Sequence, residues 1–423
     1  MHTTDRIGRA WRQGAAVVAV LMLAAACAGG AAPSASAPAS PPAATTPAGS
    51  APASAAAGTK HVAIVNKDMT DEEVKTAVAQ EGSLIVGNWT YTANDALVKE
   101  FKAYVKQNYG ADIQFTYEGT QTPSVYLQKL AAAKAGGNPA PYDVLAIEEN
   151  YWADAKDQDL VDNAFPSDLI PNASKVLDMF KHDPQSIAFQ STAFPGVVYE
   201  KSKVQLTSLM DLAKPELKKK VTLPLPGDIT AGGFFLGLAS EMGKDYKDAA
   251  QMKQVVDWAV QNIGPNVLKY TTDSAEMQQL LRSGAADAVT FWNSLARLEF
   301  FSGKNPDATL LLPKTIYPVN GYLWIPKGAA HPVLAQIFMN WRLSPDVQFP
   351  NKWPIDHAPW SELSEGFLGP DYVNQVPDWF AKDYSKYYPT LDQIKSSFQT
   401  VDWAAYNAGQ KEWQDYYAEK IGQ

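Results

Sequence analysis

Aromatic, amide and carboxylate side chains follow several predicted strands in two separate parts of the sequence. The candidates for ligand contact are Asn88, Trp89, Tyr91, Glu118, Glu149 and Tyr151 in the first part, and Asp228, Trp292, Asn293 and Asn320 in the second. Carboxylates pair with ammonium groups, and aromatic ring faces attract them by about 0.5–2 kcal/mol each. Since this set contains no lysine or arginine, its chemistry suits an organic cation or another amine-bearing ligand.

A second chemistry is open at Gly232 and Gly233, near the start of a predicted helix. The N–H groups at a helix N-terminus bind anions, and glycine lets a ligand approach them closely. A carboxylate, sulfonate or phosphonate ligand is therefore the alternative to a cation. The same glycines would also let the helix pack closely against a neighbour, which is the simpler explanation.

Catalysis has little support in the sequence. Glu118 or Glu148 with Asp228 could form the paired carboxylates of a cell-surface hydrolase. However, the sequence contains no Gly-x-Ser-x-Gly, His-Glu-x-x-His, P-loop or Gly-x-Gly-x-x-Gly motif. Its five histidines are scattered and none has metal-ligand spacing. We therefore predict a binding protein without enzyme activity, cofactor or metal.

Strands and helices alternate along two stretches of the chain, as is typical of parallel α/β sheets. Thr70 and Glu73 form a predicted capping box for a helix that stops at Gly82. Further predicted elements are strands at 83–87, 113–117, 142–147, 221–225, 267–270 and 286–291, and helices at 94–110, 125–135, 231–242, 249–263 and 275–282. Extended runs at 196–199 and 317–325 separate these stretches, and residues 331–423 are predicted to be mostly helical.

We predict an α/β fold with two lobes, each a mostly parallel sheet flanked by helices, joined by two extended crossings. Residues 61–195 would form the first part of lobe 1, and 196–318 would form lobe 2. Residues 319–423 would supply the return crossing and C-terminal helices that pack on lobe 1. In open α/β sheets, ligands bind beyond the carboxyl ends of the strands, which is where the candidate residues stand.

Composition narrows the class of protein. The chain has 423 residues, of which 46% are hydrophobic and 19% charged, as expected of a globular protein. Its formal net charge of −9 argues against a nucleic-acid-binding protein, which would carry a basic surface. A single cysteine cannot form an intrachain disulfide or a cysteine-rich metal site.

That cysteine ends a predicted targeting segment. Arg6, Arg9 and Arg12 precede an apolar stretch at 14–26, which is the pattern of a secretory signal. The small residues before Cys27 resemble a bacterial lipobox, although the leucine lies four residues before the cysteine instead of three. This resemblance implies that residues 1–26 are removed, and that Cys27 carries acyl chains that anchor the protein on the extracytoplasmic face of the cell membrane. Residues 27–60, rich in alanine, proline and serine, would form a disordered linker.

Three stretches of the ordered part resemble the solute-binding proteins of ABC importers, nearest the spermidine/putrescine-binding branch of the type II periplasmic-binding fold. They are Asn88-Trp89-Thr90, the Ser-Leu-Met-Asp-Leu-Ala-Lys-Pro-Glu-Leu-Lys segment at 208–218, and Ser283-Gly284-Ala285-Ala286-Asp287 followed by Phe291-Trp292-Asn293. The resemblance implies a monomeric two-lobed clamp that closes on a small-molecule ligand and delivers it to the transmembrane subunits of an ABC permease.

The resemblance leaves the ligand open. Asp228 lies near the carboxylate with which the polyamine branch binds amines. In contrast, the chain has Val319-Asn320-Gly321 where that branch has Trp-x-Asp on the second crossing. The iron-binding branch has a tyrosine pair where this chain has Phe291-Trp292-Asn293. A polyamine or other organic cation is therefore favoured, with an anion or an iron chelate as the alternatives.

Overall fold

The computed structural model describes residues 58–88, 95–119, 121–175, 188–293, 305, 307–311, 313–344, 347 and 396–423. The predicted signal segment, Cys27 and the linker up to residue 57 lie outside the described residues, as do Trp89 and Tyr91. In the described part of the chain, no helix has the length and apolar character needed to span a membrane.

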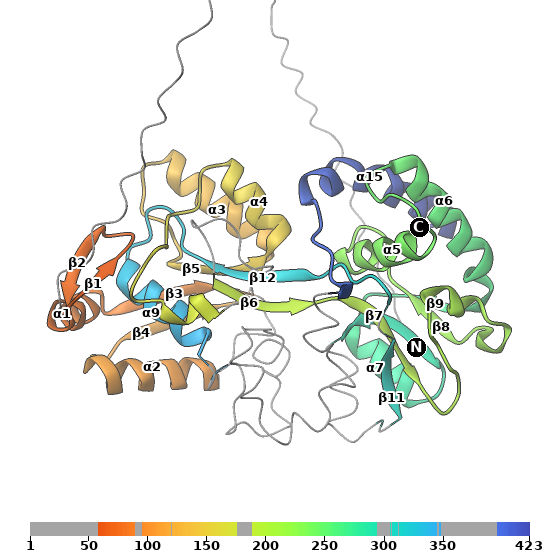
Figure 1. Ribbon diagram of the computed structural model, residues 1–423, viewed down its shortest axis with the longest axis horizontal. Helices are drawn as coiled ribbons and strands as arrows, with labels where there is room; N and C mark the ends of the chain where they lie inside the picture. Colours follow the sequence, from red (N-terminus) through yellow and green to blue (C-terminus); the bar gives the residue numbers. More distant parts are fainter. Residues whose placement is uncertain are drawn as a thin grey trace, which may run out of the picture. The chain divides into compact units, whose positions relative to one another are not determined.

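The first of two five-stranded sheets has the strand order β4-β3-β5-β12-β6. Its strands are β3 (Ser83–Gly87), β4 (Gln114–Glu118), β5 (Val144–Glu148), β6 (Ala188–Ala193) and β12 (Val319–Trp324). The helices beside it are α1 (Asp71–Glu81), α2 (Asp95–Tyr109), α3 (Pro123–Ala135), α4 (Glu149–Asp157) and α9 (Pro332–Arg342). Helices α3 and α4 lie on one side of this sheet, whereas α2 and α9 lie on the other (Figure 1). The α2–α9 side is packed by aromatic rings, with Phe101 in edge contact with Phe115 and Phe338.

The second sheet has the order β11-β7-β10-β8-β9. Its strands are β7 (Pro195–Glu200), β8 (Val221–Leu223), β9 (Val267–Tyr270), β10 (Ala288–Trp292) and β11 (Ala308–Leu311). Helices α5 (Ile229–Glu241), α6 (Ala249–Asn262) and α15 (Trp403–Ile421) lie on one side of it, and α7 (Ser274–Arg282) on the other (Figure 1). The remaining elements are the β1–β2 hairpin (Thr59–Val62 and Lys67–Thr70) and the 3-10 helices η1 (Pro171–Lys175), η3 (Leu209–Ala213), η4 (Pro215–Leu217) and η5 (Gly264–Asn266).

One strand in each sheet runs against the other four. Strand β12 is antiparallel to β5 and β6, and β7 is antiparallel to β10 and β11. Each reversed strand follows a crossing from the other sheet, because β6 leads into β7 and β11 leads into β12. Pro195 of β7 pairs with Trp292 at the end of β10, and Gly321 of β12 pairs with Glu148 at the end of β5. Both crossings therefore meet the sheets at the carboxyl ends of their parallel strands.

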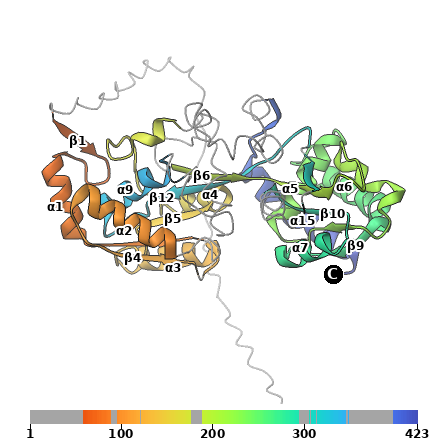
Figure 2. The same ribbon diagram turned by 90° about the horizontal axis from the view of Figure 1, so that it is seen from below.

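The fold class predicted from the sequence is confirmed, because both sheets are mixed, mostly parallel and flanked by helices. Strands β6 and β12 lie side by side in both views (Figure 1 and Figure 2). The capping box is also confirmed: Glu73 N–H donates to Thr70 Oγ1 at 3.2 Å, and Thr70 N–H donates to Glu73 Oε2 at 2.8 Å. Hydrogen bonds from Lys67 and then Thr70 lower the pKa of Glu73 to about 2.

Three features differ from the sequence prediction. The ordered chain begins earlier than residue 61, because Thr59 already pairs with Thr70 in the β1–β2 hairpin. Strand β6 (Ala188–Ala193) is absent from the elements predicted from the sequence. The C-terminal helices were predicted to pack on lobe 1. Helix α9 contacts α1 and β3, whereas α15, contrary to that prediction, packs mainly against α6 and also contacts α4. Four buried aromatic residues of α15, namely Trp403, Tyr406, Trp413 and Tyr417, belong to the core of the second sheet.

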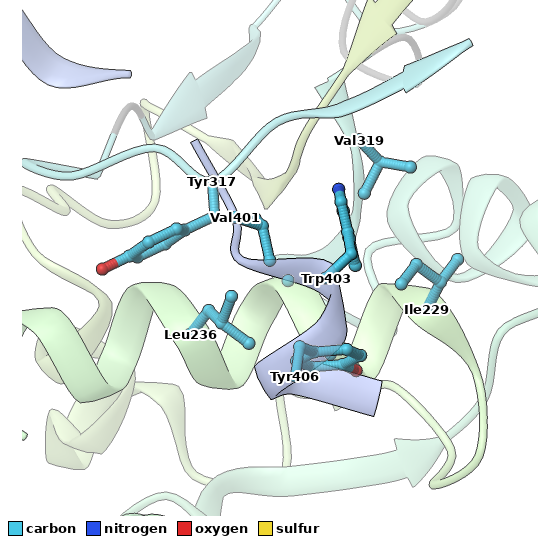
Figure 3. Close-up of a pocket in the computed structure, with 9 residues that line it drawn as sticks. Ile229, Leu236, Tyr317, Val319, Val401, Trp403 and Tyr406 are labelled. Atoms are coloured by element: carbon cyan, nitrogen blue, oxygen red, sulfur yellow. The ribbon is translucent and has the colours of Figure 1, made fainter. Parts of the chain in front are cut away.

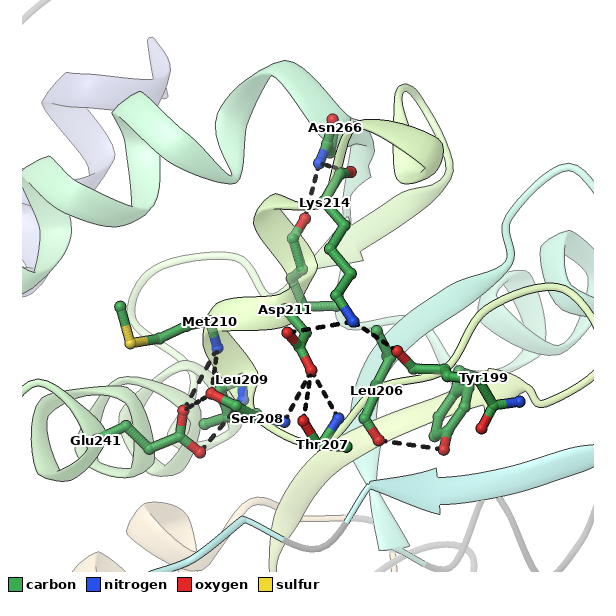
Figure 4. A network of polar contacts seen from close by, with 12 residues as sticks. Tyr199, Leu206, Thr207, Ser208, Leu209, Met210, Asp211, Lys214, Glu241 and Asn266 are labelled. Carbon is green, nitrogen blue, oxygen red and sulfur yellow. Dashed lines mark hydrogen bonds and ion pairs between the residues drawn. The ribbon is translucent and has the colours of Figure 1, made fainter.

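The segment 208–218, the most specific part of the family resemblance, folds as two 3-10 helices, of which the first begins with a capping box formed by Ser208 and Asp211 (Figure 4). Asp211 accepts hydrogen bonds from the backbone of Thr207 at 2.7 Å and of Ser208 at 3.2 Å. Glu241 of α5 accepts from the Ser208 hydroxyl at 2.5 Å, and Asn266 donates to the carbonyl of Lys214 at 2.8 Å. These contacts satisfy backbone groups at the starts of the helices, so the residues of this motif serve the fold of the second lobe.

Close packing explains the paired glycines of α5. A Cβ atom at Gly232 would lie 2.2 Å from the hydroxyl of Tyr406, and one at Gly233 would lie 2.3 Å from the ring of Pro195. Neither neighbour can withdraw easily, since Tyr406 is buried and Pro195 is a rigid ring at the β6–β7 crossing. The structure thus supports the packing explanation of these glycines over an anion-binding role.

We expect the Gly233→Ala variant to lose about 1–3 kcal/mol of unfolding free energy, because overpacking forces the Pro195 crossing to shift. The matched control is Gly409→Ala in α15, where a Cβ atom would meet no atom within 4 Å. That control should gain about 0.5–1 kcal/mol, since alanine is the better helix former. Urea unfolding of both variants measures the difference, and equal stabilities would contradict the close contact.

Candidate ligand-binding site

The first group of candidate residues lies where β3 and β4 end. Asn88 is fully buried; its backbone N–H donates to the Glu118 carbonyl at 2.9 Å, and its side-chain amide donates to the Tyr117 hydroxyl. The Asn88 carbonyl accepts from the hydroxyl of Tyr126 at 2.9 Å. The side chain of Glu118 accepts a hydrogen bond from Lys129 Nζ at its Oε1 atom, at 3.4 Å. Asn88 therefore joins the loops after β3 and β4.

The first turn of α4 follows β5 directly and carries Glu149 and Tyr151. Glu149 is 2% exposed, and its Oε2 accepts from the hydroxyl of Tyr322 on β12 at 3.4 Å. Tyr151 is half-buried, and burial raises the pKa of its hydroxyl, with further contributions from the negative charges of Glu148 and Asp228. Tyr151 is thus a neutral aromatic side chain within electrostatic range of carboxylates from both sheets.

Asp228 stands in the loop after β8, as the N-cap of α5. Its Oδ1 accepts from the backbone N–H of Thr230 at 2.7 Å. Its side chain is partly exposed, and in the described part of the chain no lysine, arginine or histidine forms an ion pair with it. The Asp228 side chain, in the loop after β8, is therefore open to a cationic partner.

Trp292 and Asn293 close β10, next to the β6–β7 crossing. The backbone N–H of Asn293 donates to the carbonyl of Phe194 at 3.0 Å, and the N–H of Phe194 donates to Asn293 Oδ1 at 3.2 Å. Since Phe194 supplies a donor, the amide oxygen must face it and Nδ2 points away. That Nδ2 atom is buried and has no hydrogen-bond partner among the described residues. Asn293 thus fixes the crossing strand, while Trp292 remains partly exposed.

The topology brings the candidates to the carboxyl edges of the two sheets, where the crossings run. Asn88, Glu118 and Glu149 follow β3, β4 and β5, as predicted from the sequence. Asp228 lies in the loop after β8, Trp292 is the last residue of β10, and Asn293 follows it. Asn320 lies in β12, but only its backbone is described, and Trp89 and Tyr91 fall outside the described residues. The electrostatic effect of Asp228 on Tyr151 links the two groups.

Comparison with known proteins shows where this arrangement occurs. The family model of bacterial extracellular solute-binding proteins matches residues 88–349, which is more than half of the chain. The chain belongs to this family. Among curated protein sequences, none matches the chain significantly.

Solved structures of solute-binding proteins share the fold at low identity. A spermidine/putrescine ABC transporter substrate-binding protein from Streptococcus pneumoniae is 20% identical, with a TM-score of 0.60 over 81% of this chain and 98% of that one. The TpPotD lipoprotein of Treponema pallidum is 17% identical, with a TM-score of 0.59 over 78% and 99%. An iron- and citrate-bound protein of Trichodesmium is 14% identical, with a TM-score of 0.55 over 81% and 99%. These similarities establish the two-lobed fold of the family and leave the ligand open.

The solute-binding protein also has an apolar pocket that the sequence did not reveal, between α5 and the start of α15 (Figure 3). Its lining residues are Ile229, Gly232, Gly233, Leu236, Tyr317, Val319, Val401, Trp403 and Tyr406. Burial raises the pKa of the Tyr406 hydroxyl, and the charge of Asp228 raises it further. The pocket therefore has no charge of its own but lies close to Asp228. No sequence pattern could indicate it, because α15 lies more than 150 residues after α5.

Two observations concern possible metal-ligating and hydrolytic groups. No group of three or more histidine, cysteine, aspartate or glutamate side chains gathers as a metal site within the described ranges. Ser83, His331 and Asp143 do have the connectivity of a catalytic triad: Ser83 Oγ lies 2.9 Å from His331 Nε2, and His331 Nδ1 lies 2.9 Å from Asp143 Oδ2. However, Glu81 accepts the N–H groups of Val333 and Leu334 at the start of α9, which would be the nearby donors for an oxyanion. The network also lies at the amino ends of β3 and β5, away from the candidate site.

We interpret the Ser83–His331–Asp143 network as an attachment of α9 to the first sheet. His331→Ala should lower the unfolding free energy by about 1–3 kcal/mol, because the ring loses its hydrogen bonds to Ser83 and to the buried Asp143. The oxygens of Asp143 would keep the backbone N–H groups of Ile85 and of position 331, at 2.8 and 3.0 Å. The control is His61→Ala. His61 pairs with Asp68 at 3.0 Å in a more exposed place, with 31% of the His61 side chain and 40% of the Asp68 side chain exposed. That variant should lose less than about 1 kcal/mol in the same denaturation experiment.

Proposed function

We propose that the protein captures an organic cation, with a polyamine as the leading candidate, and delivers it to an ABC permease. The observation that carries this proposal is Asp228, a carboxylate at the carboxyl edge of the second sheet that has no basic ion-pair partner among the described residues. Tyr151 supports the proposal from the first sheet, because its neutral ring lies within electrostatic range of the same carboxylate. A carboxylate with aromatic neighbours is the usual recognition chemistry for ammonium groups.

The proposed ligand contacts are the side chains of Asn88, Trp89, Tyr91, Glu118, Glu149, Tyr151, Asp228, Trp292, Asn293 and Asn320. They come from both sheets, so a ligand that contacts both would stabilise the closed arrangement of the lobes. The crossings after β6 and β11 supply the segments about which the lobes would move. A monomeric protein would suffice for this mechanism, with the permease as its protein partner.

A ligand panel tests the proposed chemistry. The signal-processed protein would be titrated with spermidine, putrescine, choline, thiamine, ferric citrate and organic anions, by thermal shift and calorimetry. A ligand at 100 times its Kd should stabilise the protein by about 2.7 kcal/mol. A response to an amine supports the proposal. A response to an anion or to ferric citrate alone, with none to the amines, would contradict it in favour of the other ligand classes.

The proposed membrane anchor has its own test. We expect the Cys27→Ser variant, which cannot carry acyl chains, to appear in the soluble extracytoplasmic fraction or the medium. The wild-type protein should fractionate with the membrane, because two or more acyl chains anchor stably whereas one is marginal. Immunoblots of both fractions measure the distribution. Membrane retention of Cys27→Ser would refute acylation of this cysteine as the anchor.

A further inference from the structure

The loop Pro224–Asp228, which connects β8 to α5 and carries Asp228, has its polar backbone groups satisfied by the C-terminal helix. The carbonyl of Pro224 accepts a hydrogen bond from the hydroxyl of Tyr417 at 3.0 Å. The backbone N–H of Gly227 donates to Gln414 Oε1. Gly227 has a φ of 85°, a conformation that glycine adopts readily. Pro224 and Gly227 are therefore both held by side chains of α15, which lie 193 and 187 residues later in the sequence.

The side chains that hold the loop are themselves fixed. Tyr417 is fully buried, with its ring 4.7 Å from that of Phe235, and Gln414 is 6% exposed. Because Gly227 donates an N–H, the oxygen of the Gln414 amide must face the loop. The nitrogen then faces the other way and donates to the hydroxyl of Tyr406 at 3.3 Å. Because both the oxygen and the nitrogen of this buried amide have hydrogen-bond partners, Gln414 is suited to hold the loop in one conformation.

The loop cannot easily supply these contacts itself. Pro224 and Pro226 have no N–H group, which leaves few local hydrogen bonds to order the segment. Downstream, α5 begins at Asp228, whose carbonyl accepts the N–H of Gly232 at 3.2 Å. The position of the Asp228 carboxylate thus depends on a loop whose upstream half is ordered by α15.

We propose that α15 holds the binding loop Pro224–Asp228 in its ligand-ready conformation, with Gln414 and Tyr417 as positioning residues. The inference rests on the proposed function only in naming Asp228 as a ligand contact. A loop ordered in advance lowers the entropy lost on binding and so raises affinity without touching the ligand. The helix would therefore influence affinity from outside the site.

The test compares variants of α15 that lose a loop contact with variants that keep both. Gln414→Met and Tyr417→Phe remove the two loop contacts. The matched controls are Gln410→Met, since the Gln410 amide donates to Asn407 at 3.4 Å, and Tyr416→Phe, since Tyr416 donates to Asp257 on the exposed side at 2.8 Å. Hydrogen exchange of the ligand-free proteins would be measured at the amides of Leu225 and Gly227, with the amides of α6 and β3 as internal references.

We expect exchange at Gly227 to become at least about tenfold faster in Gln414→Met, with the reference amides unchanged. Leu225 should exchange faster in Tyr417→Phe, and both controls should match the wild type. Unchanged exchange in both loop variants would overturn the proposal, whether or not any cation binds. Uniformly faster exchange across the second lobe would also overturn it, since that would be general destabilisation.

Spermidine titrations of the same variants separate this inference from the proposed function. Where the wild type binds, the Kd of the loop variants should rise about 3- to 10-fold at temperatures well below unfolding, with the controls unchanged. Faster loop exchange without weaker binding would overturn the positioning role. Failure of the wild type to bind any amine would instead refute the proposed ligand class, while the exchange experiment still decides whether α15 holds the loop.

Discussion

The Asp228→Asn variant is expected to bind spermidine about 10- to 100-fold more weakly than the wild type, because a charge-assisted contact is worth about 1.5–3 kcal/mol. Asparagine is as good an N-cap as aspartate, so its side-chain oxygen can still accept from the Thr230 N–H. The substitution thus removes the charge and keeps the start of α5. The melting temperature should change little, which separates loss of binding from loss of fold.

The control for this prediction is Asp248→Asn. Asp248 is the N-cap of α6 and accepts from the N–H groups of Ala250 and Gln251 at 2.9 and 3.2 Å. Both variants lower the negative charge of the protein by one, so a general electrostatic effect would weaken both equally. Calorimetry at one ionic strength distinguishes the cases. Equal Kd values for the two variants, or a wild-type Kd for Asp228→Asn, would contradict the prediction that Asp228 contacts the ligand.

Much of the fold could be predicted because its signals are local. The capping box at Thr70 and Glu73, the left-handed glycine at Gly82 and the apolar strand after it depend on residues close in sequence. Strands β6 and β11 were missed because their pairing partners lie far away in the sequence: the partner of β6 among the described strands is β12, more than 120 residues later. For the same reason, the reversed directions of β7 and β12 become visible only in the sheets.

The candidate site shows a similar division. The rule that ligands bind at the carboxyl ends of strands selected Asn88, Asp228 and Trp292, which the structure places at the carboxyl edges of the two sheets. It could not show that the polar groups of Asn88 and the amide oxygen of Asn293 serve the backbone of neighbouring loops and of the crossing. Residue type indicates a possible ligand contact, whereas tertiary structure decides how much of its hydrogen-bonding capacity remains for a ligand.

The placement of α15 illustrates a further limit of sequence analysis. Trp403, Tyr406, Trp413 and Tyr417 recur at intervals that put them on one face of a helix, so burial of this face was predictable. The identity of the covering surface was not, because an apolar face fits any apolar partner of suitable shape. The structure places the face against α5 and α6, where Trp413 lies 5.6 Å from the ring of Phe235.

This placement predicts the largest effect on stability. The Trp413→Ala variant should lose about 3–5 kcal/mol of unfolding free energy, as expected for deletion of a fully buried indole. Trp413 is 1% exposed, and its neighbour Tyr406 lies 6.4 Å away between ring centres. Urea denaturation measures the loss, and Glu412→Ala serves as control because Glu412 forms only an exposed ion pair with Lys253. That control should change stability by less than about 1 kcal/mol.

The part of the protein that loses stability in Trp413→Ala distinguishes the two placements of α15: packing on the second lobe, as in the structure, or on lobe 1, as predicted from the sequence. If the helix belongs to the second lobe, hydrogen exchange in Trp413→Ala should accelerate in α5, α6 and β8, while β3, β4 and α2 of the first lobe keep their protection. Acceleration in the first lobe instead would restore the sequence-based placement. Because Trp413 lies one residue before Gln414, the same variant should also loosen the loop at Gly227, so instability of α15 and loss of order at Asp228 should appear together.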